Sequence, residues 1–114
     1  MADHEPFHWI NTQTVVNQSM ASSFVSTTLD IDEVTSYSIQ ATWTGTPVGT
    51  VKAQGSNNVA LLGWTDITDS ISAVSGPGTY LLNVERPSYS FVQFVYTFTS
   101  GTGTMNAVLN AKRD

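Results

Sequence analysis

Apolar and polar residues alternate with a period of two along most of the chain from residue 24 onward, which is typical of strands that bury one face. The clearest example is the stretch 36–44, where Tyr37, Ile39, Ala41 and Trp43 fall on one side and Ser, Gln and Thr residues fall on the other. The same pattern predicts further strands at 23–31, 49–56, 64–68, 78–85, 90–100 and 104–112.

The segments between these strands are rich in Gly, Pro, Asn and Ser, the residues that favour turns. No segment has the 3.6-residue apolar repeat of a helix, so the pattern favours an all-β fold. We expect an antiparallel β-sandwich with a jelly-roll-like or discoidin-like connection and an N-terminal arm. The stretch 42–58 is predicted to be a hairpin reversed at Gly45, Pro47 and Gly49, and "SGTGT" a final hairpin.

The first 23 residues have no clear period, apart from a short predicted strand at 14–17. We therefore interpret 1–23 as an arm and 24–114 as a single sandwich domain. Phe7, Trp9 and Ile10 place three large apolar side chains in this arm. Two interpretations stay open for them: a surface that binds a partner, or side chains that fold back on the chain's own core.

Size and charge limit the function classes. The chain has 114 residues, enough for one domain with its own core, and no cysteine, which excludes disulfides and thiolate metal sites. Its formal net charge of -5 disfavours nucleic acid and anionic membranes as partners. We see neither a membrane-spanning run nor a secretory signal, and the chain starts with Met, so we expect a complete small gene product.

Catalytic patterns are missing from the sequence. The two histidines, His4 and His8, both lie in the predicted arm, which is a poor support for a catalytic base. No nucleophile elbow, phosphate-binding loop or dinucleotide fingerprint occurs. We therefore predict a protein that is not an enzyme and has no cofactor.

Two groups of acidic or histidine residues have side chains that could bind a metal ion. His4, Glu5 and His8 have a helical spacing that suits a divalent ion, but Pro6 interrupts them, so a solvated arm is the simpler interpretation. The run "LDIDEVT" offers carboxylates that suit Ca²⁺ but lacks the glycine of a calcium loop, and a polar turn explains it as well. We predict no metal site, while Ca²⁺ binding by Asp30, Asp32 and Glu33 stays an open question.

One loop end is a candidate for ligand binding. Asn57, Asn58, Trp64 and Asp66 combine amides, a carboxylate and an aromatic ring near one turn, a set that suits a carbohydrate. Trp43, by contrast, shares its strand face with Tyr37 and Ile39, so we assign it to the core.

Two stretches resemble small β-sandwich virion proteins of tailed bacteriophages. They are "YSIQATWTGTPVGTVKAQGSNN", followed by "WTDI", and "GTYLLNVERPSYSFVQFVYTFTSGTGTMNAVLNAK". The "GSNN…WTDI" part is also similar to discoidin-like domains, although Asn58 and Val59 replace the Asp and Gly of that pattern.

The phage resemblance implies a structural protein of the particle, such as a head decoration or cement protein. Proteins of that kind bind the major capsid protein, stabilise the head and are often homotrimers. The resemblance therefore implies a location on the capsid surface of the virion after synthesis in the cytoplasm of a host bacterium. The alternative is a lectin-like, carbohydrate-binding adhesion module on the virion surface.

Overall fold

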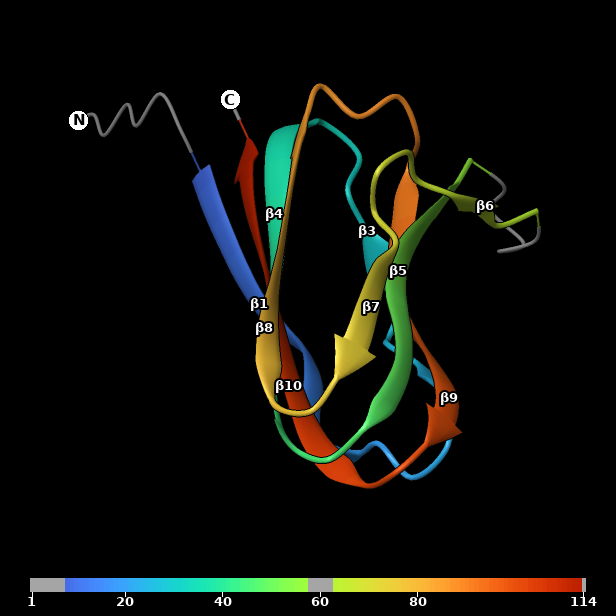
Figure 1. Ribbon diagram of the computed structural model, residues 1–114. Coiled ribbons are helices and arrows are strands. Elements are labelled where there is room, and N and C mark those ends of the chain that lie inside the picture. The colour runs from blue at the N-terminus through green and yellow to red at the C-terminus, as the bar shows by residue number, and fades with distance from the viewer. Residues whose placement is uncertain (1–7, 58–62, 114) are drawn as a thin grey trace.

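Two antiparallel sheets pack face to face in the computed structural model, which describes residues 8–57 and 63–113 (Figure 1). One sheet has the strand order β1-β10-β4-β8, and the other has the order β2-β9-β5-β6, with β3 on β9 and β7 on β5. The strands are β1 (His8–Ser19), β2 (Phe24–Val25), β3 (Leu29–Asp30), β4 (Val34–Gly45), β5 (Val48–Ser56), β6 (Thr65–Asp66), β7 (Ser72–Ser75), β8 (Gly78–Glu85), β9 (Phe91–Ser100) and β10 (Gly103–Arg113).

The chain moves between the sheets at most of its connections. If β2 is counted with β3, and β6 with β7, eight strand positions form two four-stranded sheets, which is a jelly-roll-like arrangement. The predicted all-β, antiparallel sandwich is confirmed. No helix occurs in the described part of the chain, so none of those residues forms a helix that could cross a membrane.

The core lies between the two sheets and is built from the inward stripes of the long strands. Along β4 every second residue from Tyr37 to Trp43 is buried, as the alternation predicted. Strand β9 contributes Val92, Phe94 and Tyr96, each at most 1% exposed. Strand β10 contributes its own small and large apolar residues, namely Met105, Ala107, Leu109 and Ala111.

The two predicted hairpins are crossovers between the sheets. Strand β4 pairs with β10 and β8, while β5 pairs with β9, β6 and β7, so the stretch 42–58 joins opposite layers. The "SGTGT" stretch likewise leads from β9 in one sheet to β10 in the other. The two crossovers pack on each other, and the Thr46 amide donates to the Thr102 carbonyl over 2.7 Å.

Most of the predicted arm is a strand. Strand β1 pairs with β10 from His8 to Ser19, so the boundary at residue 23 does not separate an arm from the sandwich. Register shifts on both sides of Val15 interrupt the alternation, and Asn17 has a φ of 44°. Such bulges place extra residues in a strand, which is why the period of two is hidden here.

The structure describes two of the three large apolar residues of the predicted arm, Trp9 and Ile10. Ile10 is half-buried and packs against the core, which supports the interpretation that it folds back on its own chain. Trp9 lies in β1 with its backbone opposite Lys112, and Phe7 is outside the described residues. Partner binding by Phe7 and Trp9 stays a prediction.

The predicted strand at 23–31 is also interrupted. It forms two short pieces, β2 and β3, and Val25 is 53% exposed although it was expected to share a buried face with Ile31. Ser26 is buried instead, and its hydroxyl accepts a hydrogen bond of 2.8 Å from the Phe94 amide. The Ser26 hydroxyl thus bonds to the β9 backbone at the break between β2 and β3. The alternation shifts by one residue at this point, so that Ser26 is buried and Val25 is exposed.

Candidate functional site

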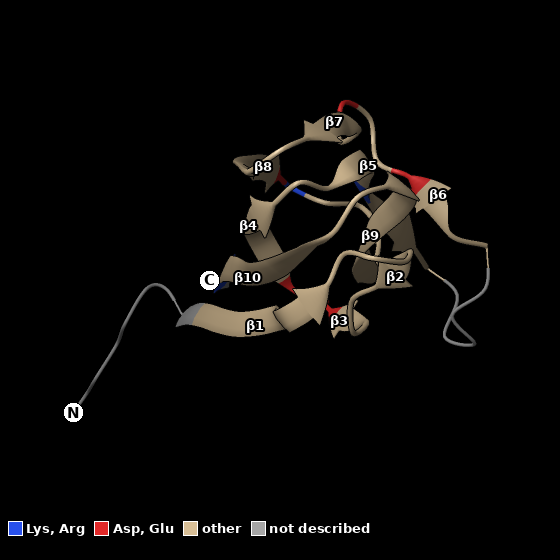
Figure 2. Ribbon diagram, turned by 60° about the horizontal axis from the view of Figure 1, so that its bottom comes forward, with Lys and Arg blue, Asp and Glu red and all other residues tan. Residues whose placement is uncertain are grey.

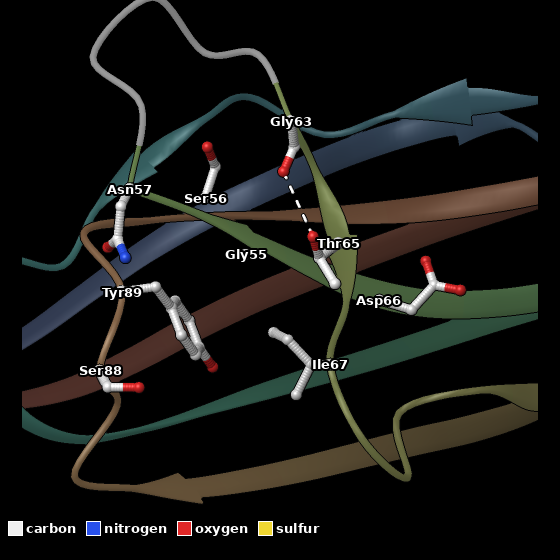
Figure 3. Close-up of a pocket in the computed structure, with 9 residues that line it drawn as sticks. All are labelled: Gly55, Ser56, Asn57, Gly63, Thr65, Asp66, Ile67, Ser88 and Tyr89. Carbon is white, nitrogen blue, oxygen red and sulfur yellow. Dashed lines mark hydrogen bonds between the residues drawn. The ribbon is translucent and has the colours of Figure 1, made fainter.

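A pocket lies where β5 ends, beside β6 and the connection from β8 to β9 (Figure 3). Its volume is about 320 Å³, at the lower end of the range of small-molecule sites. The described residues that line it come from three segments of the chain: Gly55, Ser56, Asn57, Gly63, Thr65, Asp66, Ile67, Ser88 and Tyr89.

The Tyr89 ring forms one wall of the pocket and is held on two sides. One side lies against Gly55, where an added Cβ would stand 2.8 Å from a ring carbon, so glycine is required at this point of β5. The Tyr89 hydroxyl lies 2.5 Å from the Tyr37 hydroxyl, and the two rings meet edge to face. The ring is therefore fixed in place before any ligand arrives.

Neither of these phenols is prepared for acid-base chemistry at neutral pH. Burial raises the pKa of Tyr37 well above its usual range, and the hydrogen bond with Tyr89 adds to this effect. The pKa of Tyr89 is also raised by burial. Both hydroxyls stay protonated, so the pair acts as a structural link and offers the pocket an apolar ring face.

Asn57 lines the pocket in a fixed orientation. Its Oδ1 accepts a hydrogen bond of 2.9 Å from the Ser90 amide, which also lies 3.2 Å from the Ser56 carbonyl. The Asn57 Nδ2 donates to none of the described residues. Its amide group therefore presents donors at the pocket wall, while ligand binding by this residue stays a prediction.

Asp66 lies at the edge of the pocket, with its carboxylate turned away from Tyr89 (Figure 3). Its Oδ1 accepts a hydrogen bond of 2.9 Å from Gln54 Nε2 and forms an ion pair of 3.0 Å with Lys52. Gln93 continues this network by donating to Gln54 over 2.9 Å. The bond from Gln54 and the charge of Lys52 lower the pKa of Asp66, so the carboxylate stays ionised.

The predicted ligand loop is thus only partly assembled. Asn57 and Asp66 both border the pocket, but Asp66 is engaged on the outer face of its sheet. Trp64 is half-buried and does not line the pocket, and Asn58 lies outside the described residues. Sequence reasoning missed Tyr89 and Ile67, because their position depends on strands that are distant along the chain.

The acidic run at 30–33 has a structural explanation. Asp30 Oδ1 accepts a hydrogen bond of 2.9 Å from the Asp32 amide, which closes a turn, and Glu33 has a φ of 64°. Within residues 8–57 and 63–113, no group of three His, Cys, Asp or Glu side chains is placed to hold a metal ion.

No protein-family model and no curated protein sequence matches this chain. Solved structures do share the fold. The SPBc2 prophage-derived protein YomS matches with a TM-score of 0.59 and 8% identity, over 96% of this chain and 99% of YomS. The PBSX exported protein XepA matches with a TM-score of 0.63 and 9% identity, over 90% of this chain and 36% of XepA.

A subunit of the disulfide-linked endospore appendages of Bacillus matches with a TM-score of 0.54 and 14% identity, over 100% of this chain and 96% of that one. At such identities the likeness concerns the fold, because one fold supports many functions. The resemblance to small β-sandwich proteins of phages is confirmed at this level, since YomS has the same fold over almost its full length.

Proposed function

We propose that this chain is a non-enzymatic structural protein of a bacteriophage particle. In this proposal it is a head decoration protein that binds the major capsid protein and stabilises the head. The observation that carries the proposal is the fold likeness to the prophage-derived YomS, which spans nearly the whole of both chains. The sequence resemblance to virion proteins supports the same role, as does the absence of a catalytic pattern in the sequence.

Binding to phage heads is the direct test. The purified protein should co-sediment with heads of the phage that carries the coding sequence, reach saturation, and raise the temperature at which the heads open. An unrelated acidic protein of the same size should remain in the supernatant. If purified virions contain no peptide of this chain and the heads bind none of it, the structural role is refuted.

Carbohydrate binding is the second candidate function, and the pocket beside Tyr89 favours it. A fixed ring face, the Asn57 donors and the hydroxyls of Thr65 and Ser88 form a small set that suits one sugar unit. A glycan array should then detect binding.

The variant Asn57→Asp tests the pocket itself, because it keeps the acceptor for the Ser90 amide and removes the Nδ2 donors. Loss of one such hydrogen bond should weaken binding about tenfold, as measured by calorimetry with the best glycan of the array. An array at background level, or an affinity that the variant leaves unchanged, would contradict a sugar site here.

A further inference from the structure

The outer face of the β1-β10-β4-β8 sheet is made almost entirely of uncharged residues. We call it the amide face, because Asn and Gln side chains occur on all four strands, at positions such as Gln13, Gln40, Asn83 and Asn110. Its middle row runs across the sheet through Gln13, Val108, Gln40 and Leu81, which are paired in register. Paired residues point to the same side of a sheet, so this row forms one continuous strip.

Charge is distributed very unevenly between the surfaces. Strands β1 and β4 contain no Lys, Arg, Asp or Glu, and β8 and β10 carry theirs at one end only, at Glu85, Lys112 and Arg113 (Figure 2). The whole chain nevertheless has a formal net charge of -5. The amide face is thus a neutral surface on an acidic protein, and the cores of protein interfaces are depleted in charge in the same way.

Several of the amides are held in fixed positions by one another. Asn11 donates to Asn110 over 3.2 Å, and Gln13 donates to Asn106 over 3.3 Å. Asn106 also accepts from the Asn17 amide over 2.8 Å. Ordering these side chains in the free protein reduces the entropy that a partner would otherwise have to remove on binding.

The face also has a projection and a hollow side by side. Leu81 is 61% exposed and stands in the middle row of the amide face. A hollow of about 440 Å³ lies over the next two rows, where the small side chains of Ser36 and Ser38 leave space beside Asn83 and Asn110, and Glu85 lines its outer end. The two features lie two residues apart along the strands, since Leu81 is opposite Gln40 and Asn83 is opposite Ser38.

We propose that the amide face binds a second copy of this chain, with the Leu81 of each copy in the Ser36–Ser38 hollow of the other. An amide carries both a donor and an acceptor, so identical amide surfaces complement each other about a two-fold axis. On a neutral face, two chains of net charge -5 also avoid direct repulsion. The result is an isologous pair, which differs from the trimer that the phage resemblance implies.

The area of the amide face indicates how tightly two copies are expected to bind each other. Four strands at their usual spacing and about nine residues of length span roughly 19 Å by 30 Å. Two such faces bury on the order of 1,200 Å², the lower end of the range for specific interfaces, where weak and transient pairs occur, so a dimer that depends on protein concentration is expected. Because screening reduces the repulsion between acidic chains, added salt should leave the pair intact or strengthen it.

Sedimentation velocity of the full chain at increasing concentrations is the test. We expect a dimer whose dissociation constant rises about tenfold or more in the variants Leu81→Glu and Gln40→Glu, because each buries a charge against the partner's face, and Leu81→Glu brings it into the hollow that Glu85 also lines. Both side chains are exposed, so circular dichroism and the unfolding temperature should stay unchanged. Val25→Glu is the matched control, because it adds the same charge at a 53% exposed position of the other sheet.

Each outcome decides the proposal. A chain that remains monomeric at all concentrations, a trimer, or a dimer that Val25→Glu weakens as much as Leu81→Glu does would overturn it. This inference rests on the proposed structural role in the particle, but a negative result for the dimer would leave that role intact. It concerns association of the pure protein, whereas the role in the particle depends on binding to heads.

Discussion

Replacing Gly101 with alanine is expected to reduce the free energy of unfolding by about 3–5 kcal/mol, a large share of the stability of a small domain. Two effects add at this position. The backbone has a φ of 86°, in the left-handed region that disfavours a Cβ. The added Cβ would also meet the Thr46 carbonyl oxygen at 1.9 Å, which is backbone and cannot rotate away.

Gly76→Ala separates these two effects. Gly76 has a similar φ of 74°, but no atom lies within 4 Å of an added Cβ, so only the backbone strain of about 1–2 kcal/mol applies. Urea unfolding followed by tryptophan fluorescence gives both values. Equal losses for the two variants would show that the contact between the crossovers contributes nothing.

The Gly101 contact joins the two connections that were predicted to be hairpins and are crossovers between the sheets. Gly101 approaches Thr46, and Gly103 approaches Thr44, so the connection from β9 to β10 lies directly on the connection from β4 to β5. A short turn rich in Gly and Pro is compatible with a hairpin and with a crossover alike. What distinguishes them is the close packing of two turns that are far apart in sequence, which no local pattern records.

The alternation predicted the long strands well because each of them buries one face. The expected strand at 78–85 coincides with β8, and the expected ends of β9 and β10 are each within one residue of the observed ends. Strand β1 was not recognised as a sheet edge, since its bulges near Val15 disturb the period on which the prediction depends.

The sequence could indicate only those residues of the candidate site that lie close together along the chain. Asn57 follows a strand end, was named in the predicted ligand loop, and lines the pocket. Tyr89 was missed because its position depends on Tyr37, which belongs to the other sheet and lies 52 residues away in the sequence. Asp66, from the same predicted loop, also borders the pocket, but Gln54 and Lys52 on the neighbouring strand β5 hold its carboxylate on the outer face of the sheet.

Phe94→Ala should be the most damaging single substitution in the core. Phe94 is 1% exposed, and its ring packs at 5.3 Å from the Tyr80 ring, whose hydroxyl is tied to the Ser70 carbonyl over 2.7 Å. Because this anchored ring cannot follow the truncated side chain, a cavity remains. We expect a loss of about 3–5 kcal/mol, which lowers the unfolding temperature by roughly 15 °C.

Phe98→Ala provides the matched control on the same stripe of β9. Both phenylalanines have a backbone amide that donates to a serine hydroxyl over 2.8 Å, Ser26 for Phe94 and Ser23 for Phe98. Phe98 is only half-buried, so its truncation removes less apolar area from the core and should cost about 1–2 kcal/mol. Thermal and urea unfolding give both values, and a cost for Phe98→Ala equal to that for Phe94→Ala would contradict the assignment of Phe94 to the centre of the core.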